Sequence, residues 1–408
     1  MYSQGVLQWG HGIIDATAVS GLRALLTACV LTSAGLALPA AAELPNILNV
    51  SVGGSVRQDS NLFRQPDGQK TAETINNGYI RLSIDKAFSQ QRFQLEATET
   101  ATRYTSFKQL NYDALNYKGA WYWRVTPWIS GTLSADRSKT LTAFEDTLGN
   151  QRNVSIRENR AFNVDGLLYG GLHLIGGVSQ SDQTSEQLIQ TQPDFRSVSV
   201  NAGIQYVTRA GNSMSALRRT TDGKYQNLTV NPTQPDYTQE ETELKATWTL
   251  DGKSSMTGRL AWLKRSQDGA PQNDFSGPAS DIALNWTPTG KLALAFAASR
   301  STGPLQDPSF NYVVNDTLSF TPTWSLSAKT AVNLNIARKT LEYRGRGLMP
   351  PVGPARSETI DSVAIGFNWV AMRNLSIGAN LENQKRSSNV PGLDFSTTIS
   401  SITAALTF

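Results

Sequence analysis

The chain has 408 residues, of which 39% are hydrophobic and 17% charged, and its mean hydropathy is -0.31. These averages are those of an ordinary soluble protein and do not suggest a bundle of membrane helices. The formal net charge is +4, but the basic residues form no run of the kind that binds nucleic acid, so the sequence gives no support to a nucleic-acid partner.

The first segment differs from the rest of the chain. After Arg23, the apolar run "ALLTACVLTSAGLALP" leads into "AAAE". A basic residue, an apolar core and a site of small residues are typical of a secretory signal, which predicts a cleaved signal peptide over 1–42 and a mature domain over 43–408. The alternative is an uncleaved N-terminal helix. Cleavage removes Cys29, the one cysteine, and so excludes disulfides, thiolate metal sites and thiol nucleophiles in the mature chain.

Clean apolar runs in the mature part are short. The longest, "LALAFAA", covers 292–298, whereas a membrane-spanning helix needs about 20 residues. If this chain crosses a membrane, a closed β-barrel is therefore the structure that remains, because it satisfies every backbone polar group internally.

The mature chain alternates between apolar and polar residues. This period of two is clear over 80–84, 244–250, 332–336 and 363–369, where side chains such as Trp248 and Trp369 fall on the apolar phase. Strict alternation predicts strands with one dry face and one wet face. A soluble β-sandwich would show the same alternation.

The connections between the strands distinguish a membrane barrel from a soluble sandwich better than the alternation does. We expect eighteen strands between Ile47 and Phe408, joined alternately by tight turns and long loops. The tight turns are expected near Ser89, Pro127, Gly170, Gly211, Gly252, Gly290, Ser327 and Arg373. The long loops are expected over 57–76, 108–113, 139–158, 183–194, 222–238, 267–278, 301–311, 342–356 and 386–394.

This pattern predicts an all-β fold, a transmembrane antiparallel β-barrel of about 18 strands in the outer membrane of a Gram-negative cell, with short periplasmic turns and long extracellular loops. Tryptophan placement favours the same fold. All the mature tryptophans except Trp262 lie within a few residues of an expected tight turn. Indole rings prefer the membrane–water interface, although they also favour strand ends in a soluble sandwich.

The chain stops with "SITAALTF", in the middle of an alternating pattern. We expect Leu406 and Phe408 to lie in a last strand that closes against the first, since an open edge in lipid is costly. A terminal aromatic is also the usual mark recognised by the barrel assembly machinery. Outer-membrane lipid and that machinery are therefore expected partners.

A barrel of this size encloses a lumen too wide for side chains to fill. The polar phase of the strands supplies the candidate pore-lining residues, which are Arg81, Asp85, Lys118, Arg124, Lys245 and Arg259. A mildly basic lumen would favour anionic solutes. The alternative is that these are ordinary solvated charges, since Glu96 and Glu243 lie on the same face. We also hypothesise that loops 57–76 and 139–158 fold inward and narrow the lumen.

The sequence gives little support to catalysis. The mature chain has one histidine, His173, beside an expected tight turn, and no serine motif accompanies it. Nucleophilic serine chemistry needs a base within hydrogen-bond reach. Histidine pairs and acidic loops with metal-binding spacing are absent from the sequence. We therefore expect no enzyme activity, no cofactor and no metal site.

The first long loop reads "VRQDSNLFRQPDGQKTAETI", and "QQR", "LNYD" and "WYW" follow it. With these motifs the chain resembles the exosortase-B-associated extracellular-polysaccharide outer-membrane proteins (the EpsL type). The residues that carry the resemblance in the loop are Asp59, Asn61, Phe63 and Arg64. The resemblance implies a barrel that serves as the outer-membrane exit for a polysaccharide and works with periplasmic polysaccharide-export proteins. It implies no catalytic residues.

Two alternatives to export stay open, a general diffusion porin for small and possibly anionic solutes and a non-transporting scaffold. Phe63 can likewise be interpreted in two ways. It packs the loop against the barrel rim, which we favour because buried loop aromatics commonly do so, or it offers a platform for sugar rings.

Overall fold

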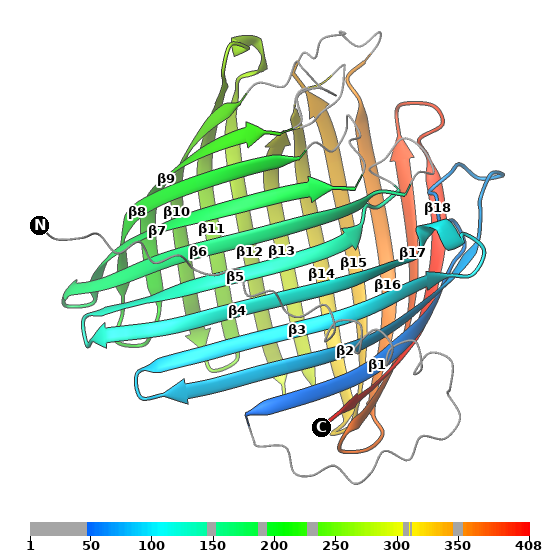
Figure 1. The fold of residues 1–408 in the computed structure, drawn as a ribbon, viewed down its shortest axis with the longest axis horizontal. Helices are drawn as coiled ribbons and strands as arrows, with labels where there is room; N and C mark the ends of the chain where they lie inside the picture. The colour runs from blue at the N-terminus through cyan, green and yellow to red at the C-terminus, as the bar shows by residue number, and fades with distance from the viewer. Residues whose placement is uncertain are drawn as a thin grey trace, which may run out of the picture.

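Eighteen antiparallel strands close into one barrel in the computed structural model of the chain (Figure 1), as the sequence predicts. The structure describes residues 47–144, 152–186, 194–226, 236–304, 310, 312–345 and 354–408. The predicted signal peptide, 1–42, lies outside these residues. The strands are β1 (Leu48–Asp59), β2 (Glu73–Phe88), β3 (Gln91–Tyr104), β4 (Tyr112–Thr126), β5 (Ile129–Leu141), β6 (Val154–Tyr169), β7 (Leu172–Ser185), β8 (Phe195–Val207), β9 (Ser213–Tyr225), β10 (Tyr237–Asp251), β11 (Ser254–Gln267), β12 (Phe275–Thr289), β13 (Leu292–Pro304), β14 (Tyr312–Ser327), β15 (Thr330–Arg344), β16 (Ser357–Val370), β17 (Leu375–Ser388) and β18 (Phe395–Thr407).

Each strand pairs with its neighbours in the sequence, and β1 pairs with both β2 and β18. This last pairing makes the seam of the barrel and leaves the sheet with no open edge. Closure satisfies the backbone of every strand within the sheet, which lipid requires. Two single-turn 3₁₀ helices, Lys108–Leu110 and Pro271–Asn273, lie in the connections. No helix in the described ranges is long and apolar enough to cross a membrane.

Short turns and long connections alternate around the barrel as expected, and they lie at opposite ends (Figure 1). Most strands are longer than the sequence suggests, so the long connections are shorter, except the second, which covers 105–111 rather than 108–113. The first long connection covers 60–72 rather than 57–76. Backbone pairing between the strands continues beyond the apolar band of the wall. In this outer part charged side chains form ion pairs with one another. One such pair, Arg103 with Asp113 at 2.7 Å, joins the ends of β3 and β4.

The two faces of the wall differ in chemistry. On β10, Leu244 and Leu250 point outward and are 57% and 61% exposed, whereas Glu241 and Glu243 on the opposite face are 7% and 5% exposed. The same alternation recurs on the other strands. A broad, exposed apolar surface around the outside is what a lipid-facing barrel requires, with the polar face turned to the lumen.

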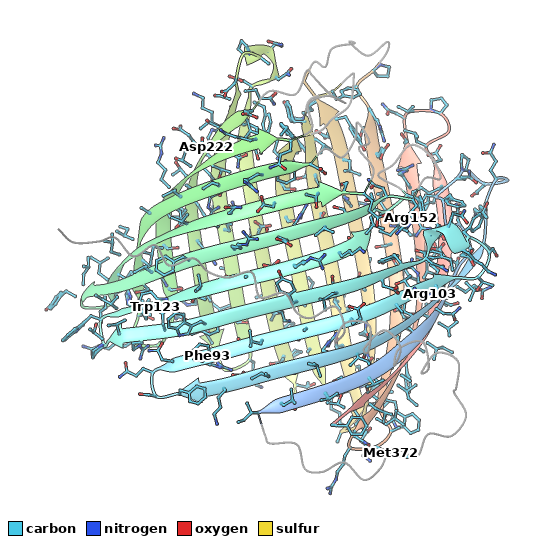
Figure 2. The ribbon with its side chains drawn as sticks, in the orientation of Figure 1. Phe93, Arg103, Trp123, Arg152, Asp222 and Met372 are labelled. Carbon is cyan, nitrogen blue, oxygen red and sulfur yellow. The ribbon has the colours of Figure 1, made fainter. Side chains whose placement is uncertain are left out.

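Aromatic side chains gather toward the short-turn end of the outer surface. Phe93 stacks on Trp121 with ring centroids 5.8 Å apart, and Trp123 stacks on Phe162 at 5.9 Å. Figure 2 shows Phe93 and Trp123 toward this end, and Arg103 and Arg152 toward the end with the long loops. The rings form the aromatic girdle expected at a membrane interface.

Trp262, the exception in the sequence pattern, is also outward-facing and 58% exposed. It lies in the half of β11 nearer the long-loop end, in register with Thr242 of β10. Its position is that of the opposite membrane interface, and tryptophan is enriched at both interfaces. The exception therefore fits the barrel rather than weakening it.

Candidate functional site

All six candidate pore-lining residues lie on the strand face that is opposite to the lipid-facing side chains. On β2, for example, Arg81 and Asp85 alternate with the outward-facing Leu82. Lys118 pairs in register with Glu96, and Lys245 with Arg259. The structure thus places them on the lumen wall, while their part in conduction stays a prediction.

Four of the six residues form ion pairs with neighbours of opposite charge. Glu96 lies between Arg81, at 3.8 Å, and Lys118, at 3.4 Å. Asp85 accepts hydrogen bonds from both Arg92, at 2.5 and 2.8 Å, and Gln94, at 2.9 Å. The lumen wall therefore carries both signs, and paired charges attract a passing ion less than free ones.

The fourth, Arg259, is at the centre of the largest network on this wall. Its Nε donates to Glu243 at 2.6 Å and its Nη1 to Asp281 at 3.0 Å, and it also pairs with Glu241. Arg219 pairs with Glu241 at 3.1 Å from the other side. The two glutamates are almost fully buried. Since two adjacent buried carboxylates repel one another, the ion pairs with the two arginines offset that repulsion.

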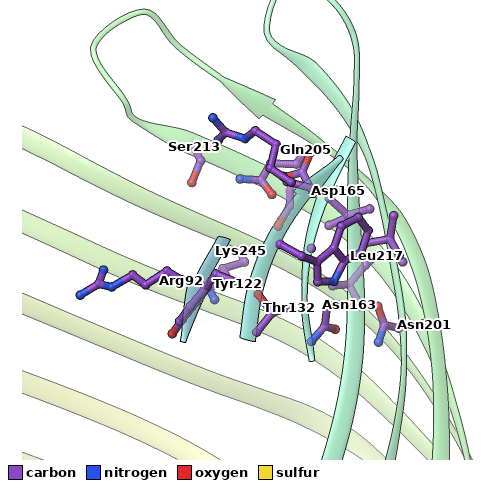
Figure 3. A pocket seen from close by; sticks show the side chains of 18 of the residues that line it. Arg92, Tyr122, Thr132, Asn163, Asp165, Asn201, Gln205, Ser213, Leu217 and Lys245 are labelled. Carbon is purple, nitrogen blue, oxygen red and sulfur yellow. The ribbon is translucent and has the colours of Figure 1, made fainter. Parts of the chain in front are cut away.

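Arg124 and Lys245 are in a different situation. Within the described residues, no carboxylate lies within ion-pair distance of either side chain. Both line a cavity of about 710 Å³ in the lumen wall toward the short-turn end (Figure 3). The wall of this cavity is built from nine successive strands, β2 to β10. Free cations beside water are the charges best able to act on a solute.

The same cavity contains polar residues that sequence reasoning missed. Amide side chains from two strands, β6 and β8, face it, together with a tyrosine and a threonine; these are Asn163, Asn201, Gln205, Tyr122 and Thr132. Asp165 also faces it and lies 2.5 Å from Nδ1 of His173. The sequence offers only the polar phase as a signal, because strand register decides which of these residues share a space.

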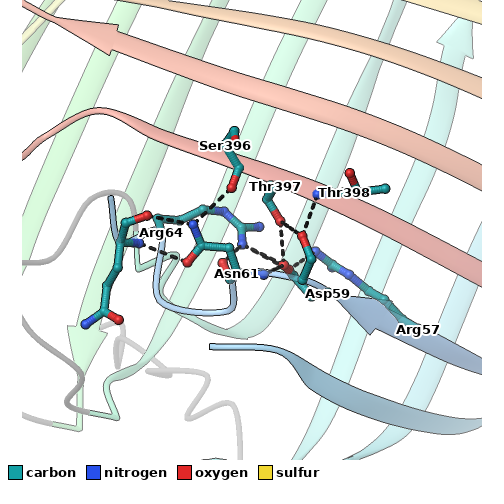
Figure 4. A network of polar contacts seen from close by, with 9 residues as sticks. Arg57, Asp59, Asn61, Arg64, Ser396, Thr397 and Thr398 are labelled. Carbon is teal, nitrogen blue, oxygen red and sulfur yellow. Dashed lines mark hydrogen bonds and ion pairs between the residues drawn. The ribbon is translucent and has the colours of Figure 1, made fainter. Parts of the chain in front are cut away.

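The loop motif forms a second organised site, at the long-loop end of the seam (Figure 4). Asp59 is 1% exposed and accepts hydrogen bonds from Thr397 of β18 at 2.8 Å and from the backbone N–H of Asn61 at 3.0 Å. Its other partners are Arg64, at 2.9 and 3.0 Å, and Arg57, at 3.2 Å. The motif therefore joins the first loop and β1 to the last strand. We call this group, Asp59, Asn61, Arg64 and Thr397, the seam clasp.

Asn61 and Arg64 complete the clasp. The Asn61 amide donates to the backbone carbonyls of Gln65, at 2.7 Å, and Ser396, at 3.0 Å, and its own oxygen accepts from the Gln65 N–H. Arg64 adopts a φ of 55°, which is uncommon for a residue with a Cβ. Its guanidinium contacts to Asp59 and to the Asn61 carbonyl hold that conformation.

A further bridge reinforces the clasp from the exposed side of the loop. Lys70 donates to the Ser396 hydroxyl at 2.6 Å and pairs with Asp67 at 2.9 Å. The hydrogen bonds from Lys70 and from Ser396 hold the pKa of Asp67 below its ordinary value. Two separate parts of one loop thus reach the same strand.

Phe63 packs within the loops, as the favoured interpretation predicts. It is 7% exposed and makes edge-to-face contacts with Phe107, at 4.8 Å, and Phe144, at 4.9 Å. The cluster also includes Leu62 and Leu110. It locks the first three long connections to one another at the rim. A ring so enclosed offers no face to a sugar. Residues 145–151 of the third connection lie outside the described residues.

The other end of the seam is held by the chain terminus. The Phe408 N–H donates to the Val50 carbonyl at 2.8 Å, and the Val50 N–H donates to the Phe408 carbonyl at 3.1 Å. Leu406 lies in register with Val52 of β1 and Leu375 of β17. Both residues therefore sit where closure needs them, and recognition of Phe408 by the assembly machinery stays a prediction.

A buried acid near the rim had no signal in the sequence. Glu358 is 2% exposed and pairs with Arg356 at 2.6 Å and Arg386 at 3.8 Å, while the Tyr343 hydroxyl donates to it at 3.3 Å. Burial of a carboxylate is tolerated where cations and donors surround it. This cluster links β15, β16 and β17 beside the seam clasp, and we interpret it as structural.

Comparison with known proteins places the chain by its fold. Residues 240–408 match the model of a family described as putative beta-barrel porin 2. The barrel resembles that of Pseudomonas aeruginosa OccK1 (OpdK), with a TM-score of 0.51 and 11% identity over 88% of this chain and 99% of that one. The chain therefore has the fold of a porin-type outer-membrane β-barrel.

Two further solved structures resemble this porin-type barrel. OccK2 (OpdF) of the same organism gives a TM-score of 0.51 with 11% identity, covering 89% of this chain and 98% of that one. A structure of OpdK with vanillate gives 0.50 with 10% identity, covering 88% and 99%. At such identity the likeness shows the fold alone. No curated protein matches the chain.

Proposed function

We propose that this barrel is a passive pore for small hydrophilic solutes. The observation that carries the proposal is the cavity of about 710 Å³ in the lumen wall, which residues of nine strands line, many of them with polar side chains. An 18-stranded barrel is wide enough to leave an aqueous channel. One of the similar barrels was solved with vanillate, a small organic acid, which accords with a small solute. The proposal assigns no catalytic step, cofactor or metal to the chain.

The charges on the wall suggest weak ion selectivity. Arg81, Lys118 and Arg259 are compensated by carboxylates, and so are Arg92 and Arg219 of the cavity lining. Among the described residues, this leaves Arg124 and Lys245 as the cations of the cavity without an ion pair. Two free cations favour anions modestly, since the field of a wide, wet lumen is strongly screened. This makes a small anionic solute the better fit among diffusible ones.

Conductance in planar bilayers tests the proposal. The purified barrel is expected to give discrete single-channel steps, and a salt gradient is expected to give a reversal potential that indicates a slight preference for anions. The double variant Arg124→Gln/Lys245→Gln is expected to lose that preference and to keep the steps. Lys70→Gln, outside the cavity, is the matched control and leaves the potential unchanged. Absence of steps, together with absence of liposome swelling in uncharged sugars, would favour the scaffold alternative.

Polysaccharide export is the second candidate. Its support is the resemblance of the first loop and the set of amide and hydroxyl side chains in the cavity, which can hydrogen-bond to sugar hydroxyls. Under this proposal the partners are the polymer and periplasmic polysaccharide-export proteins. A strain lacking the chain is then expected to hold polymer in the periplasm rather than release it to the medium. Unchanged secretion would remove this candidate and leave the diffusion pore.

A further inference from the structure

The outer wall carries a groove that the pore does not use. It crosses the lipid-facing side of β7 to β12 and has a volume of about 540 Å³. Its floor is made of small residues, Ala216, Ala246 and Gly258; Ala246 of β10 is in register with Gly258 of β11, and Ala216 of β9 lies diagonally beside Ala246, opposite Leu244. Larger side chains form the walls; among these are Ile204, Met214, Leu244, Leu260 and Ile282. Almost all of the lining is apolar carbon, as an acyl chain would require.

The floor of this groove is open. A Cβ built on Gly258 meets no heavy atom within 4 Å, so this glycine leaves space that nothing in the described wall fills. The neighbouring walls stand clear of it, since Leu244 and Leu260 are each 57% exposed. The space over Gly258 therefore comes from the absence of a side chain at this position.

Charged residues edge the groove on the side of the long loops. Arg218 follows Ala216 by two residues on β9, about 6.6 Å along a strand. It points outward, is paired with Glu240 at 3.0 Å and keeps 64% of its side chain exposed. Lys264, also exposed, stands opposite Glu240 in the register of β10 and β11. Two cations and one acid leave this edge with a net positive charge.

Trp262 and Thr242 lie in the same row as Arg218. Trp262 marks the membrane interface, so the cations stand at the level of lipid headgroups and the groove below them at the level of acyl chains. A basic pair at the interface above an apolar slot complements one kind of molecule, a lipid with a phosphorylated headgroup. A second protein copy would match the apolar slot but not the charge at its edge.

We propose that the groove on β7 to β12 binds a phosphorylated glycolipid of the outer leaflet, lipopolysaccharide, with one acyl chain over Gly258 and a phosphate at Arg218 and Lys264. The long-loop end of an outer-membrane barrel faces the cell exterior, which places this edge in the leaflet made of that glycolipid. The proposal is independent of what passes through the lumen. Binding would hold the barrel at a fixed depth and orientation among its lipids.

Native mass spectrometry of the detergent-purified, full-length barrel with added lipid A from a deep-rough lipopolysaccharide tests this. The unaltered barrel is expected to hold one lipid more tightly than the rest. Gly258→Leu fills the slot without a clash and is expected to abolish that site. Arg218→Gln/Lys264→Gln is expected to weaken it by about fivefold per charge removed, since one basic residue near an anionic lipid contributes about 1 kcal/mol. Arg218→Lys, which keeps the charge, retains most of the binding.

Two matched control variants test whether added bulk or a lost charge elsewhere on the outer face changes lipid A binding. Ala97→Leu places the same leucine side chain on the outer face of β3, and Arg300→Gln removes an outward arginine that is paired with Asp316 at 2.6 Å but lies four strands from β9. Neither is expected to change lipid A binding. Equal losses in these controls, undiminished binding in Gly258→Leu, or a stronger response to phosphatidylglycerol than to lipid A would each overturn the proposal. So would a second copy of the barrel replacing the lipid in the spectrum.

Discussion

Asp59 and Thr397 lie 338 residues apart in the chain, and the Thr397 hydroxyl donates a 2.8 Å hydrogen bond to the buried Asp59 carboxylate. This contact spans the seam between the first and last strands at the long-loop end. At the opposite end, Val50 and Phe408 exchange two backbone hydrogen bonds. The seam is thus fastened above and below the lipid-facing part of the wall.

Replacing Asp59 by asparagine is expected to weaken the clasp. The substitution keeps the shape and the acceptor for Asn61, but it leaves Arg64 and Arg57 without their negative partner in a site that is 1% exposed. Loss of a buried, charge-assisted partner costs about 2 kcal/mol. Urea unfolding of the refolded barrel, followed by tryptophan fluorescence, measures the change.

Asp67→Asn is the matched control for that experiment, since it removes a carboxylate from the same loop. Asp67 is 74% exposed in its pair with Lys70, and solvent screens exposed pairs so that they contribute little to stability. Equal effects of the two substitutions would contradict the assignment of Asp59 to the seam. Unfolding temperatures read from gel mobility give an independent measurement.

The strands and their connections could be predicted from sequence because lipid imposes the period of two on every strand. The positions of Trp248 and Leu250, for instance, predict the outer face of β10 even when the neighbouring strands are not considered. The two-residue alternation does not determine the register between neighbouring strands. Sequence alone therefore cannot distinguish Arg259, which three carboxylates hold, from Arg124, which faces the cavity without one.

The loop motif also shows that sequence alone does not reveal contacts between distant residues. Its residues could be selected by resemblance, yet their role depends on Thr397 and Ser396, which contact them only after the barrel has closed. The buried Glu358 had no sequence signal, since its partners Arg356 and Arg386 look like ordinary rim charges. Such long-range polar contacts are decided by closure and not by local pattern.

Removing the ring of Phe63 is expected to loosen the loops at the rim. Phe63→Ala takes away edge-to-face contacts with Phe107 and Phe144, and deleting a buried phenylalanine costs about 3 kcal/mol. The loss falls on the loops, so the barrel is expected to stay folded while trypsin cleaves faster at Lys70. Cleavage rates followed by mass spectrometry measure this.

Two other substitutions sharpen the trypsin experiment. Phe63→Leu keeps most of the apolar volume and is expected to protect Lys70 better than alanine does. Phe88→Ala removes a ring that is 57% exposed at the short-turn end and leaves the rate unchanged. If Phe63→Ala cleaves no faster than the unaltered barrel, the cluster does not hold the loop.

Arg259→Gln is expected to change the ion selectivity of the lumen. It leaves Glu241 and Glu243 with Arg219 as their remaining partner and adds one net negative charge to the wall. The reversal potential in a salt gradient should shift toward cations, more so at low salt, where screening is weaker. Arg300→Gln, on the outer face, removes the same charge and should leave the potential unchanged. A shift of equal size in both would mean that the potential reports surface charge rather than the lumen.

Phe408 has two separable roles, and two variants distinguish them. Deleting Phe408 removes both backbone hydrogen bonds to Val50, so the refolded barrel should unfold at a lower temperature. Phe408→Ala keeps both bonds and removes only the ring, so its stability after refolding in vitro should match that of the unaltered barrel. If the ring is the mark that the assembly machinery recognises, the same Phe408→Ala barrel should reach the outer membrane of cells in reduced amount. Normal insertion of Phe408→Ala, with a destabilised deletion variant, would leave closure as the whole role of this residue.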